Sequence, residues 1–387
     1  MTCGGNSNLN SSGLFKKKRL VLLRNVNLFG LNVLLEVVMK EEHDYTLNRR
    51  EVNKLFTAAA VGGPLLLAAV GSDSKTPTKP DELVHRNERP SMAYRKLGRT
   101  NFMSSRLVFG CGAALAGGKG VRLLDRAFEA GINYYDIGTN AVYRESEHSF
   151  APFMKAHRES IWVASKAPPT SHKIDPEDSI TVEQAKTAAK SWTKLLDASL
   201  KDLQTEYVDA YYLMAVNNPA LISSEEIYKA FLAAKSAGKV GYFGLSTHQN
   251  ARKILKAAIE TAWYDLAMVG ITPAGWYDWT TKDLEKDTPL LTDLQPLLKQ
   301  ARDAGIGLIG MKTARYLAPL RSAGRGNPSA FDKIYNKNLK ASELNSFQRA
   351  YTYVLDHGLD VVNADMQNFK HLEENIIAAA TSHTYAG

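Results

Sequence analysis

The sequence predicts a parallel (β/α)8 barrel, the TIM-barrel arrangement, from residue 92 to residue 387. In this part of the chain a helix repeatedly ends at a glycine, and an apolar run begins within a residue or two. Glycine suits the end of a helix because it adopts the left-handed backbone conformation at little cost. The apolar runs are continuous rather than alternating, as strands buried on both faces require. The pattern occurs at residues 128–136, 235–246, 301–311 and 355–364.

Completing this pattern gives eight strand–helix units, the number that closes a TIM barrel. The predicted strands lie near residues 107–112, 133–137, 161–166, 208–214, 240–246, 266–271, 306–311 and 360–364. The predicted helices lie near residues 120–130, 147–157, 182–202, 224–237, 249–261, 293–304, 342–356 and 371–380. Two helix starts have capping-box spacing, Thr181 with Gln184 and Ser223 with Glu226. A doubly wound open sheet is the alternative fold, although no G-x-G-x-x-G follows the first strand.

The composition is that of a soluble globular protein, with 387 residues of which 44% are hydrophobic and 23% are charged. The formal charge is +8, and part of the excess lies in the four basic residues at 16–19. No basic stripe interleaved with aromatic residues occurs in the barrel region, so nucleic-acid binding is not expected. The two cysteines, Cys3 and Cys111, are too few for a four-cysteine zinc site, and no H-E-x-x-H pattern occurs. We therefore predict no metal site.

Residues 39–71 resemble a twin-arginine export signal. Arg49 and Arg50 precede a moderately apolar run, Leu55 to Val70, which is shorter than the ~20 residues needed to span a bilayer. A polar linker, residues 72–91, follows at once. The alternative is a buried helix with a basic start. The signal interpretation predicts a periplasmic or otherwise exported protein that engages the twin-arginine export machinery.

Residues 1–38 lie upstream of what such a signal needs. Their apolar part is interrupted by Arg24, by asparagines and by Glu36, so it would span a membrane poorly. Met39 opens a compact segment that leads directly to the arginine pair. Our hypothesis is that Met39 is the true start and that residues 1–38 are non-native upstream sequence. The alternative is a genuine but disordered extension.

Residues 92–380 resemble the aldo/keto reductase family. The resemblance begins with MAYRKLGRTNFMSSRLVFGCG at residues 92–112, which implies a short N-terminal β-hairpin before the first barrel strand. It continues in chain order through GINYYDIG, VYRESE, WVASKAP, YVDAYYLM, GKVGYFGLSTH, IGLIGMKT and HLEEN. No single motif is decisive, but the ordered set at barrel spacing is specific. In a barrel the chemistry gathers at the C-terminal ends of the strands, where Asp136, Lys166, Met214, Ser246 and Lys312 are predicted to lie.

The resemblance implies a catalytic set of Asp136, Tyr143 and Lys166. In this family hydride moves from a reduced nicotinamide to a carbonyl carbon, and a tyrosine protonates the oxygen. A tyrosine has a pKa near ~10, so a neighbouring ammonium is needed to bring it toward the working range. A carboxylate in turn keeps the ammonium charged and in place. Tyr143 would be the acid, Lys166 the ammonium and Asp136 the carboxylate.

Two positions depart from the family pattern. The usual tyrosine slot, five residues after Asp136, holds Ala141, and Tyr143 matches only if two residues are inserted. The alternative is that Tyr143 is a loop aromatic and the acid is missing. The usual histidine slot at the end of the fourth strand holds Met214, whose thioether donates no hydrogen bond. Loss of one such donor typically costs about 2.7–4 kcal/mol, a factor of roughly 10²–10³ in rate.

The resemblance also implies NAD or NADP as cofactor, with NAD favoured. The implied cofactor-binding residues are Ser246, Thr247, Lys312, Thr313, Gln367, Glu374 and Asn375. The glutamine usual in the sixth strand is replaced by Met268. Around the 2′-phosphate subsite, Asp365 and His371 stand where basic residues are common, and Lys370 is the remaining cation.

Two further segments have two interpretations each. The loop 316–333, with Arg321 and Arg325, would either close over a pyrophosphate or remain solvated. The WYDW segment at 276–279 would either wall a substrate pocket or form a packed lid.

The sequence thus predicts an exported oxidoreductase that reduces a small aldehyde or ketone, or oxidises the alcohol, with a nicotinamide cofactor. The alternative is a catalytically weakened barrel that acts as an envelope binding or scaffold protein. Met214 and Met268 favour the alternative, whereas Asp136 with Lys166 favours the enzyme.

Overall fold

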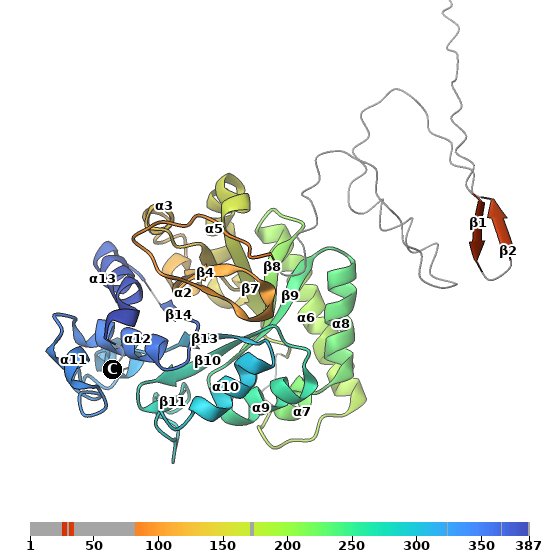
Figure 1. Ribbon diagram of the computed structural model, residues 1–387. Helices are drawn as coiled ribbons and strands as arrows, with labels where there is room; N and C mark the ends of the chain where they lie inside the picture. The colour runs from red at the N-terminus through yellow and green to blue at the C-terminus, as the bar shows by residue number, and fades with distance from the viewer. Residues whose placement is uncertain are drawn as a thin grey trace, which may run out of the picture. The chain divides into compact units, whose positions relative to one another are not determined.

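The computed structural model describes residues 25–28, 31–34, 82–170, 174–322, 324–364 and 366–385 (Figure 1). The chain divides into two compact units, Met1–Leu67 and Ala68–Gly387. The described residues of the first unit form an antiparallel pair, β1 (Asn25–Leu28) and β2 (Leu31–Leu34). The predicted export segment, residues 39–71, lies outside the described residues, and so does Met39.

The second unit contains a closed barrel of eight parallel strands, as the sequence predicts. The strands are β5 (Leu107–Gly110), β6 (Tyr134–Asp136), β7 (Trp162–Ala167), β8 (Val208–Leu213), β9 (Val240–Thr247), β10 (Leu266–Thr272), β13 (Gly307–Met311) and β14 (Val361–Ala364). Each pairs with its neighbour in parallel, and pairing of β14 with β5 and of β10 with β9 completes the ring. The doubly wound open sheet is therefore wrong.

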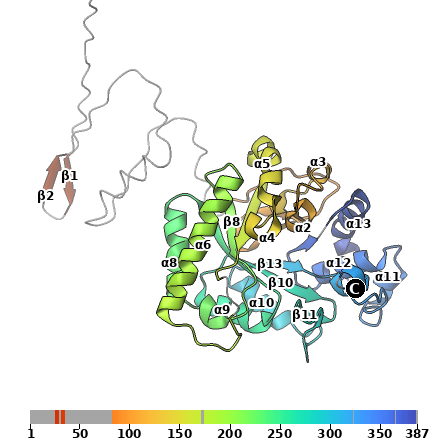
Figure 2. The same cartoon turned by 180° about the vertical axis from the view of Figure 1, so that it is seen from behind.

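Eight helices follow the barrel strands at the positions predicted, to within a few residues. They are α3 (Arg122–Glu129), α5 (Ser146–His157), α6 (Val182–Asp202), α8 (Glu225–Ser236), α9 (Ala251–Thr261), α10 (Gln295–Asp303), α12 (Ser346–Asp356) and α13 (Phe369–Ala380). Figures 1 and 2 show α6 and α8 side by side on one flank of the barrel and α12 with α13 on the opposite flank. None of the helices within the described ranges is long and apolar enough to cross a membrane.

Short elements fill the connections between these units. The short helices are α2 (Cys111–Leu115), α4 (Asn140–Tyr143), α7 (Pro219–Ile222) and α11 (Lys337–Ala341). The 3-10 turns are η1 (Gly98–Thr100), η2 (Arg158–Ser160), η3 (Arg315–Leu317), η4 (Leu320–Ser322) and η5 (Ser382–Thr384). An antiparallel hairpin, β11 (Gly275–Asp278) with β12 (Asp283–Leu284), extends from the C-terminal end of β10.

A β-hairpin closes the N-terminal end of the barrel. It consists of β3 (Tyr94–Lys96) and β4 (Met103–Ser105), which pair antiparallel. Leu97 and Phe102 in its turn are fully buried among the side chains that fill the barrel interior. Phe102 stacks on Trp162 with ring centroids 4.7 Å apart. The hairpin thus excludes water from the end of the barrel opposite the strand C-termini.

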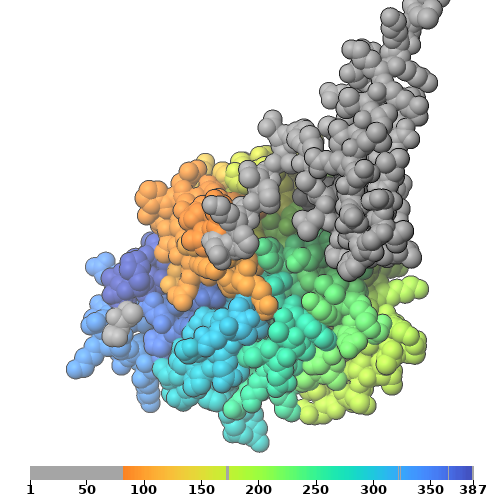
Figure 3. Space-filling model, turned by 45° about the vertical axis from the view of Figure 1, so that its right-hand side comes forward, coloured from red at the N-terminus to blue at the C-terminus, as the bar shows by residue number. Residues whose placement is uncertain are grey.

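The described part of the predicted linker, residues 82–91, is bound to the barrel. Val84 forms a bridge with Phe102, and Arg86 makes an ion pair of 3.1 Å with the buried Asp209. The side chain of Asn87 donates a 2.7 Å hydrogen bond to the carbonyl of Phe128. In Figure 3 the described residues from 82 onward, in orange, lie on the surface next to the residues drawn in cyan. Residues 82–91 therefore pack against the barrel although they precede its first strand.

One predicted capping box is confirmed and the other is wrong. Thr181 caps α6, since its hydroxyl accepts from Gln184 N at 3.2 Å and the Gln184 side chain accepts from Thr181 N at 2.8 Å. Ser223 instead ends α7, and the residue before α8 is Ser224, whose side chain makes no capping bond. A second capping box joins Asn345 to Gln348 at the start of α12.

Alanine substitutions at Thr181 and Ser223 test whether the first residue caps a helix and the second does not. We expect Thr181→Ala to lower the free energy of unfolding by about 1 kcal/mol, because Gln184 N loses its partner at the start of a long helix. Ser223→Ala is the matched control, since Ser223 is exposed and caps nothing, and we expect a change within about 0.5 kcal/mol. Urea unfolding of both variants measures the two values. Equal destabilisation by the two changes would contradict the assignment of the caps.

Candidate active site

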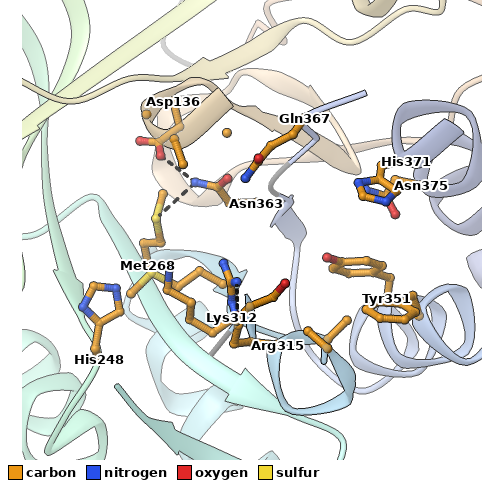
Figure 4. Close-up of a pocket in the computed structure, with 18 of the residues that line it drawn as sticks. Asp136, His248, Met268, Lys312, Arg315, Tyr351, Asn363, Gln367, His371 and Asn375 are labelled. Carbon is orange, nitrogen blue, oxygen red and sulfur yellow. Dashed lines mark hydrogen bonds between the residues drawn. The ribbon is translucent and has the colours of Figure 1, made fainter. Parts of the chain in front are cut away.

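A large cavity opens at the C-terminal ends of the barrel strands. Its volume is about 690 Å³, within the usual range for small-molecule sites. It extends from the ends of β6, β7, β9 and β10 to the first turns of α12 and α13 (Figure 4). The cavity therefore occupies the position where barrel enzymes carry their chemistry.

Asp136 and Lys166 form a buried ion pair on one wall of this cavity. Lys166 Nζ lies 2.6 Å from Asp136 Oδ2 and also donates to the carbonyl oxygen of Ile137. The same carboxylate oxygen accepts a 2.5 Å hydrogen bond from Asn363 Nδ2, drawn in Figure 4. The other carboxylate oxygen, Oδ1, has no partner among the described residues. Residues from β6, β7 and β14 thus fix the ammonium at one point of the cavity wall.

The electrostatics of the pair favour a charged lysine. Burial alone would lower the pKa of Lys166, but the attraction of Asp136 and then of Tyr143 outweighs it and raises the pKa. Burial raises the pKa of the Asp136 carboxyl, and the attraction and hydrogen bond of Lys166 and the hydrogen bond of Asn363 oppose that rise. A buried charge persists only when it is paired and hydrogen-bonded. Lys166 therefore presents an ammonium to the cavity.

Tyr143 lies beside this ammonium at the end of α4. Lys166 Nζ is 5.6 Å from the centroid of its ring. The ring fits between two glycines, because a Cβ at Gly112 would come 2.9 Å from Tyr143 Cε1 and one at Gly138 would come 2.5 Å from Cδ2. Ala141, the residue at the family's usual spacing, is exposed and does not line the cavity. Of the two positions considered for the family's tyrosine, Tyr143 is therefore the one whose side chain lines the cavity.

A buried carboxylate holds the loop that carries Tyr143. Glu147 is fully buried, accepts from Asn140 N at 3.1 Å and accepts from Ser165 Oγ at 2.7 Å. The side chain of Asn140 in turn accepts from Glu147 N at 2.9 Å. The intervening residues Arg144 and Glu145 have φ values of 26° and 61°, which non-glycine residues rarely adopt. These bonds accommodate the two extra residues that displace the tyrosine along the chain.

Two methionines stand at the positions where the family pattern has polar side chains. Met214 directly follows β8, is 7% exposed and lines the cavity. Met268 on β10 also lines it, and its sulfur lies 3.4 Å from Asn363 Nδ2. Neither thioether donates a hydrogen bond. This part of the wall is therefore less polar than the family pattern implies.

The structure brings together most of the residues predicted to bind a cofactor. Those that line the cavity are Ser246, Lys312, Gln367, Glu374 and Asn375. Thr247 and Thr313 are buried and do not line it. The hydroxyl of Thr247 instead donates to the carbonyl of Gln249, which stabilises the turn after β9.

The first turns of α13 form the far end of the cavity. Asn368 caps this helix by accepting from His371 N at 2.9 Å. Lys370 is 82% exposed, and its ammonium lies 3.9 Å from Glu374 Oε1. Asp365, predicted to face a 2′-phosphate, lies outside the described residues.

A tryptophan surrounded by cations packs behind the cavity. Trp279 has Lys282 Nζ 3.0 Å and Lys312 Nζ 4.5 Å from its ring centroid. Trp276 and Tyr277 are buried, and no residue of 276–279 lines the cavity itself. Of the two interpretations of WYDW, the packed lid therefore describes its contacts better.

The loop 316–333 contributes Ala318, Pro319 and Ser322 to the cavity wall. Its Arg325 binds Asp283 of β12 at 2.7 Å, so this guanidinium is held against the hairpin. The side chain of Arg321 lies outside the described residues.

The sequence reasoning missed His248 and Asn363. Both line the cavity. Burial, together with the positive charges of Lys312, Lys166 and Lys282, lowers the pKa of His248 to about 3, so the imidazole is neutral. Each residue had a signal in the sequence, because each is a polar side chain at or just past the end of a strand whose other residues are mainly apolar.

Comparisons with known proteins agree with the fold and place the chain in a family. Norsolorinic acid reductase B of Aspergillus parasiticus is 27% identical over 188 residues, which are 48% of this chain and 46% of that protein. An uncharacterized oxidoreductase of Bacillus subtilis is 29% identical over 157 residues, 40% of this chain and 49% of that protein. The chain thus spans about half the length of these curated relatives.

Among solved structures, an aldo-keto reductase from Bacillus halodurans in its holo form has the same fold. The TM-score is 0.54 at 20% identity, and the alignment covers 74% of this chain and 90% of that one. The profile of the aldo/keto reductase family matches residues 112–313, just over half of the chain and most of the barrel. That span contains Asp136, Tyr143 and Lys166, and with it the chain belongs to the aldo/keto reductase family.

Proposed function

We propose that this chain is an oxidoreductase that reduces a small aldehyde or ketone, or oxidises the corresponding alcohol, with a nicotinamide cofactor. The observation that carries the proposal is the meeting of Asp136, Tyr143 and Lys166 in one cavity. Relatives that are named as a reductase and an oxidoreductase support the same chemistry. The alternative of a binding or scaffold barrel rests on Met214 and Met268, which leave the proton-transfer residues untouched.

The cavity suits a nicotinamide dinucleotide in the chemistry of its lining. Lys312 and Arg315 bring positive charge to its middle, where a diphosphate requires it (Figure 4). Ser246 at the end of β9 would hold the carboxamide, while Glu374 and Asn375 on α13 would hold the adenine side. When bound, the nicotinamide would supply the hydride, or accept it in the reverse direction.

Residues of this chain would transfer the proton that the reaction needs. As hydride reaches the carbonyl carbon, Tyr143 would transfer its phenolic proton to the carbonyl oxygen, which leaves a phenolate and an alcohol. The Lys166 ammonium would stabilise that phenolate, because the two groups share one water-poor wall. Asp136 and Asn363 act by holding Lys166 in place rather than by touching the substrate.

Removing the phenol tests the proposal directly. We expect Tyr143→Phe to lower kcat by at least about 100-fold, the usual range for loss of a general acid, while the NADH dissociation constant stays within about twofold. The assay follows NADH oxidation with a panel of small aldehydes and ketones. Lys166→Met should be at least as damaging, because it removes the charge beside the phenol. Val142→Ala, at the exposed preceding residue, is the control and should retain full activity. A fully active Tyr143→Phe enzyme would exclude Tyr143 as the acid.

We also propose that NAD(H) is the preferred cofactor. At the end of the cavity formed by α13, Lys370 is the cation among the described lining residues, and it is mostly exposed and near Glu374. A 2′-phosphate carries nearly two negative charges, whereas NAD has a neutral ribose hydroxyl at that position. Asp365 follows β14 directly in the sequence and would add repulsion.

Dissociation constants measured by nicotinamide fluorescence test this preference. The wild type should bind NADH at least about tenfold more tightly than NADPH, because a net repulsion of 1.4 kcal/mol already gives that ratio. Asp365→Lys should reverse the order, and Asp293→Lys, on the surface away from the cavity, should not. Tighter binding of NADPH by the wild type would show that the 2′-phosphate subsite lies elsewhere.

Export through the twin-arginine pathway is proposed from the sequence alone. Arg49 and Arg50, the apolar run up to Val70 and the polar segment after it support this localisation.

Fractionation of cells that produce the tagged full chain tests the export proposal. Arg49→Lys combined with Arg50→Lys should retain the precursor in the cytoplasm. Arg24→Lys, upstream of the arginine pair, is the matched control and should leave export unchanged. Export that survives the double change, or export that requires residues 1–38, would refute the proposal.

A further inference from the structure

The substrate end of the cavity lacks the histidine that the family pattern places after the fourth strand. Met214 occupies that position, and its thioether offers no N–H to a carbonyl oxygen. The side-chain amide of Asn363 is also nearby, but its Nδ2 already contacts Asp136 and the sulfur of Met268. If the proposed reduction takes place here, a further donor is needed to stabilise the negative charge that develops on the oxygen.

His248 provides such a donor from the next strand. It directly follows Ser246 and Thr247 at the end of β9, which pairs with both β8 and β10. Figure 4 shows its ring on the cavity wall, on the other side of Met268 from Asp136. The strand that carries Met214 is thus the direct neighbour of the strand that carries His248.

The imidazole is held in place, yet its nitrogens remain available. The carbonyl oxygen of His248 accepts from Trp279 N at 3.2 Å, and the ring contacts the Trp279 ring with centroids 6.1 Å apart. Within the described ranges, neither ring nitrogen has a hydrogen-bond partner. A neutral imidazole always carries one N–H, so the group can donate at any pH at which the protein is folded.

We propose that His248 donates a hydrogen bond to the carbonyl oxygen of the substrate and so replaces the donor that Met214 cannot supply. This inference rests on the proposed function, and it adds a catalytic residue to it. The bond would strengthen as the oxygen gains negative charge, so it would act mainly on the transition state. Trp279 would be a positioning residue, because it contacts His248 and not the cavity.

The test compares two replacements of His248 in the full-length protein. His248→Leu removes the donor, and we expect kcat to fall by about 10²–10³-fold with little change in the NADH dissociation constant. His248→Gln keeps a neutral N–H of similar reach, and we expect kcat within about tenfold of the wild type, because an amide also donates. Introducing Met214→His into the His248→Leu protein should restore part of the lost rate. His383→Leu, at an exposed histidine outside the cavity, is the control and should change neither quantity.

The outcomes separate this inference from the proposed function. If the wild type reduces carbonyl compounds and His248→Leu is as fast, His248 is not the donor, although the proposed function stands. If both replacements weaken NADH binding together with the rate, His248 belongs to the cofactor site, and the inference is again wrong. If the wild type binds NADH but reduces no carbonyl compound in the panel, the proposed function fails, and the role of His248 fails with it.

Discussion

Closure of the parallel sheet between β14 and β5 is the constraint on which the site depends. In that register Asn363 lies opposite Val108, and Asp136 on β6 lies opposite Gly110 on the other side of β5. Asn363 reaches Asp136 across β5 because Gly110 has no side chain, and a Cβ there would come 2.5 Å from Asn363 Oδ1. The last strand of the barrel thereby supports a carboxylate on the second strand, although the two residues are far apart in sequence.

The buried pair of Asp136 and Lys166 suits chemistry better than it suits stability. Two charges taken out of water are expensive, and a pair of apolar residues of similar size is often at least as stabilising. The pair gains its value from position, because it places an ammonium beside the ring of Tyr143. The N-terminal end is closed by Leu97 and Phe102, so solvent reaches the barrel from the other end, where the cavity lies.

The displaced tyrosine shows how a barrel absorbs an insertion without losing its site. The loop joins β6 to α5, and Glu147 secures it to Ser165 on β7. Gly112 and Gly138 leave room for the Tyr143 ring, because a Cβ at either glycine would collide with it. The residues around Tyr143 therefore set the position of its ring in the cavity. The number of residues between Tyr143 and Asp136 can change without moving the ring. The same reasoning supports our proposal that His248 replaces the donor lost at Met214, since adjacent strands present their ends to one cavity.

The sequence alone determined the elements and the fold, because those depend on local periodicity. Continuous apolar runs after glycines indicated four barrel strands, and completing that repeat gave the other four. The order of motifs that resembles the family led to Asp136, Tyr143 and Lys166. Sequence pattern predicted the wrong contacts where a side chain has more than one hydrogen-bonding partner within reach. Ser223 has capping-box spacing, but α7 ends there. Thr247 and Thr313 have the expected residue types but do not line the cavity.

Only the tertiary structure decided which polar side chains meet. Asn363 and His248 are single polar residues at strand ends, and nothing in their neighbours along the chain says that one supports Asp136 and the other faces the cavity. Those roles follow from strand register and barrel closure, and closure brings Asn363 to Asp136, which lies 227 positions earlier in the chain. Hydrogen bonds and electrostatic effects act over a few ångströms in space, so the chemistry of the site is fixed only once the chain has folded.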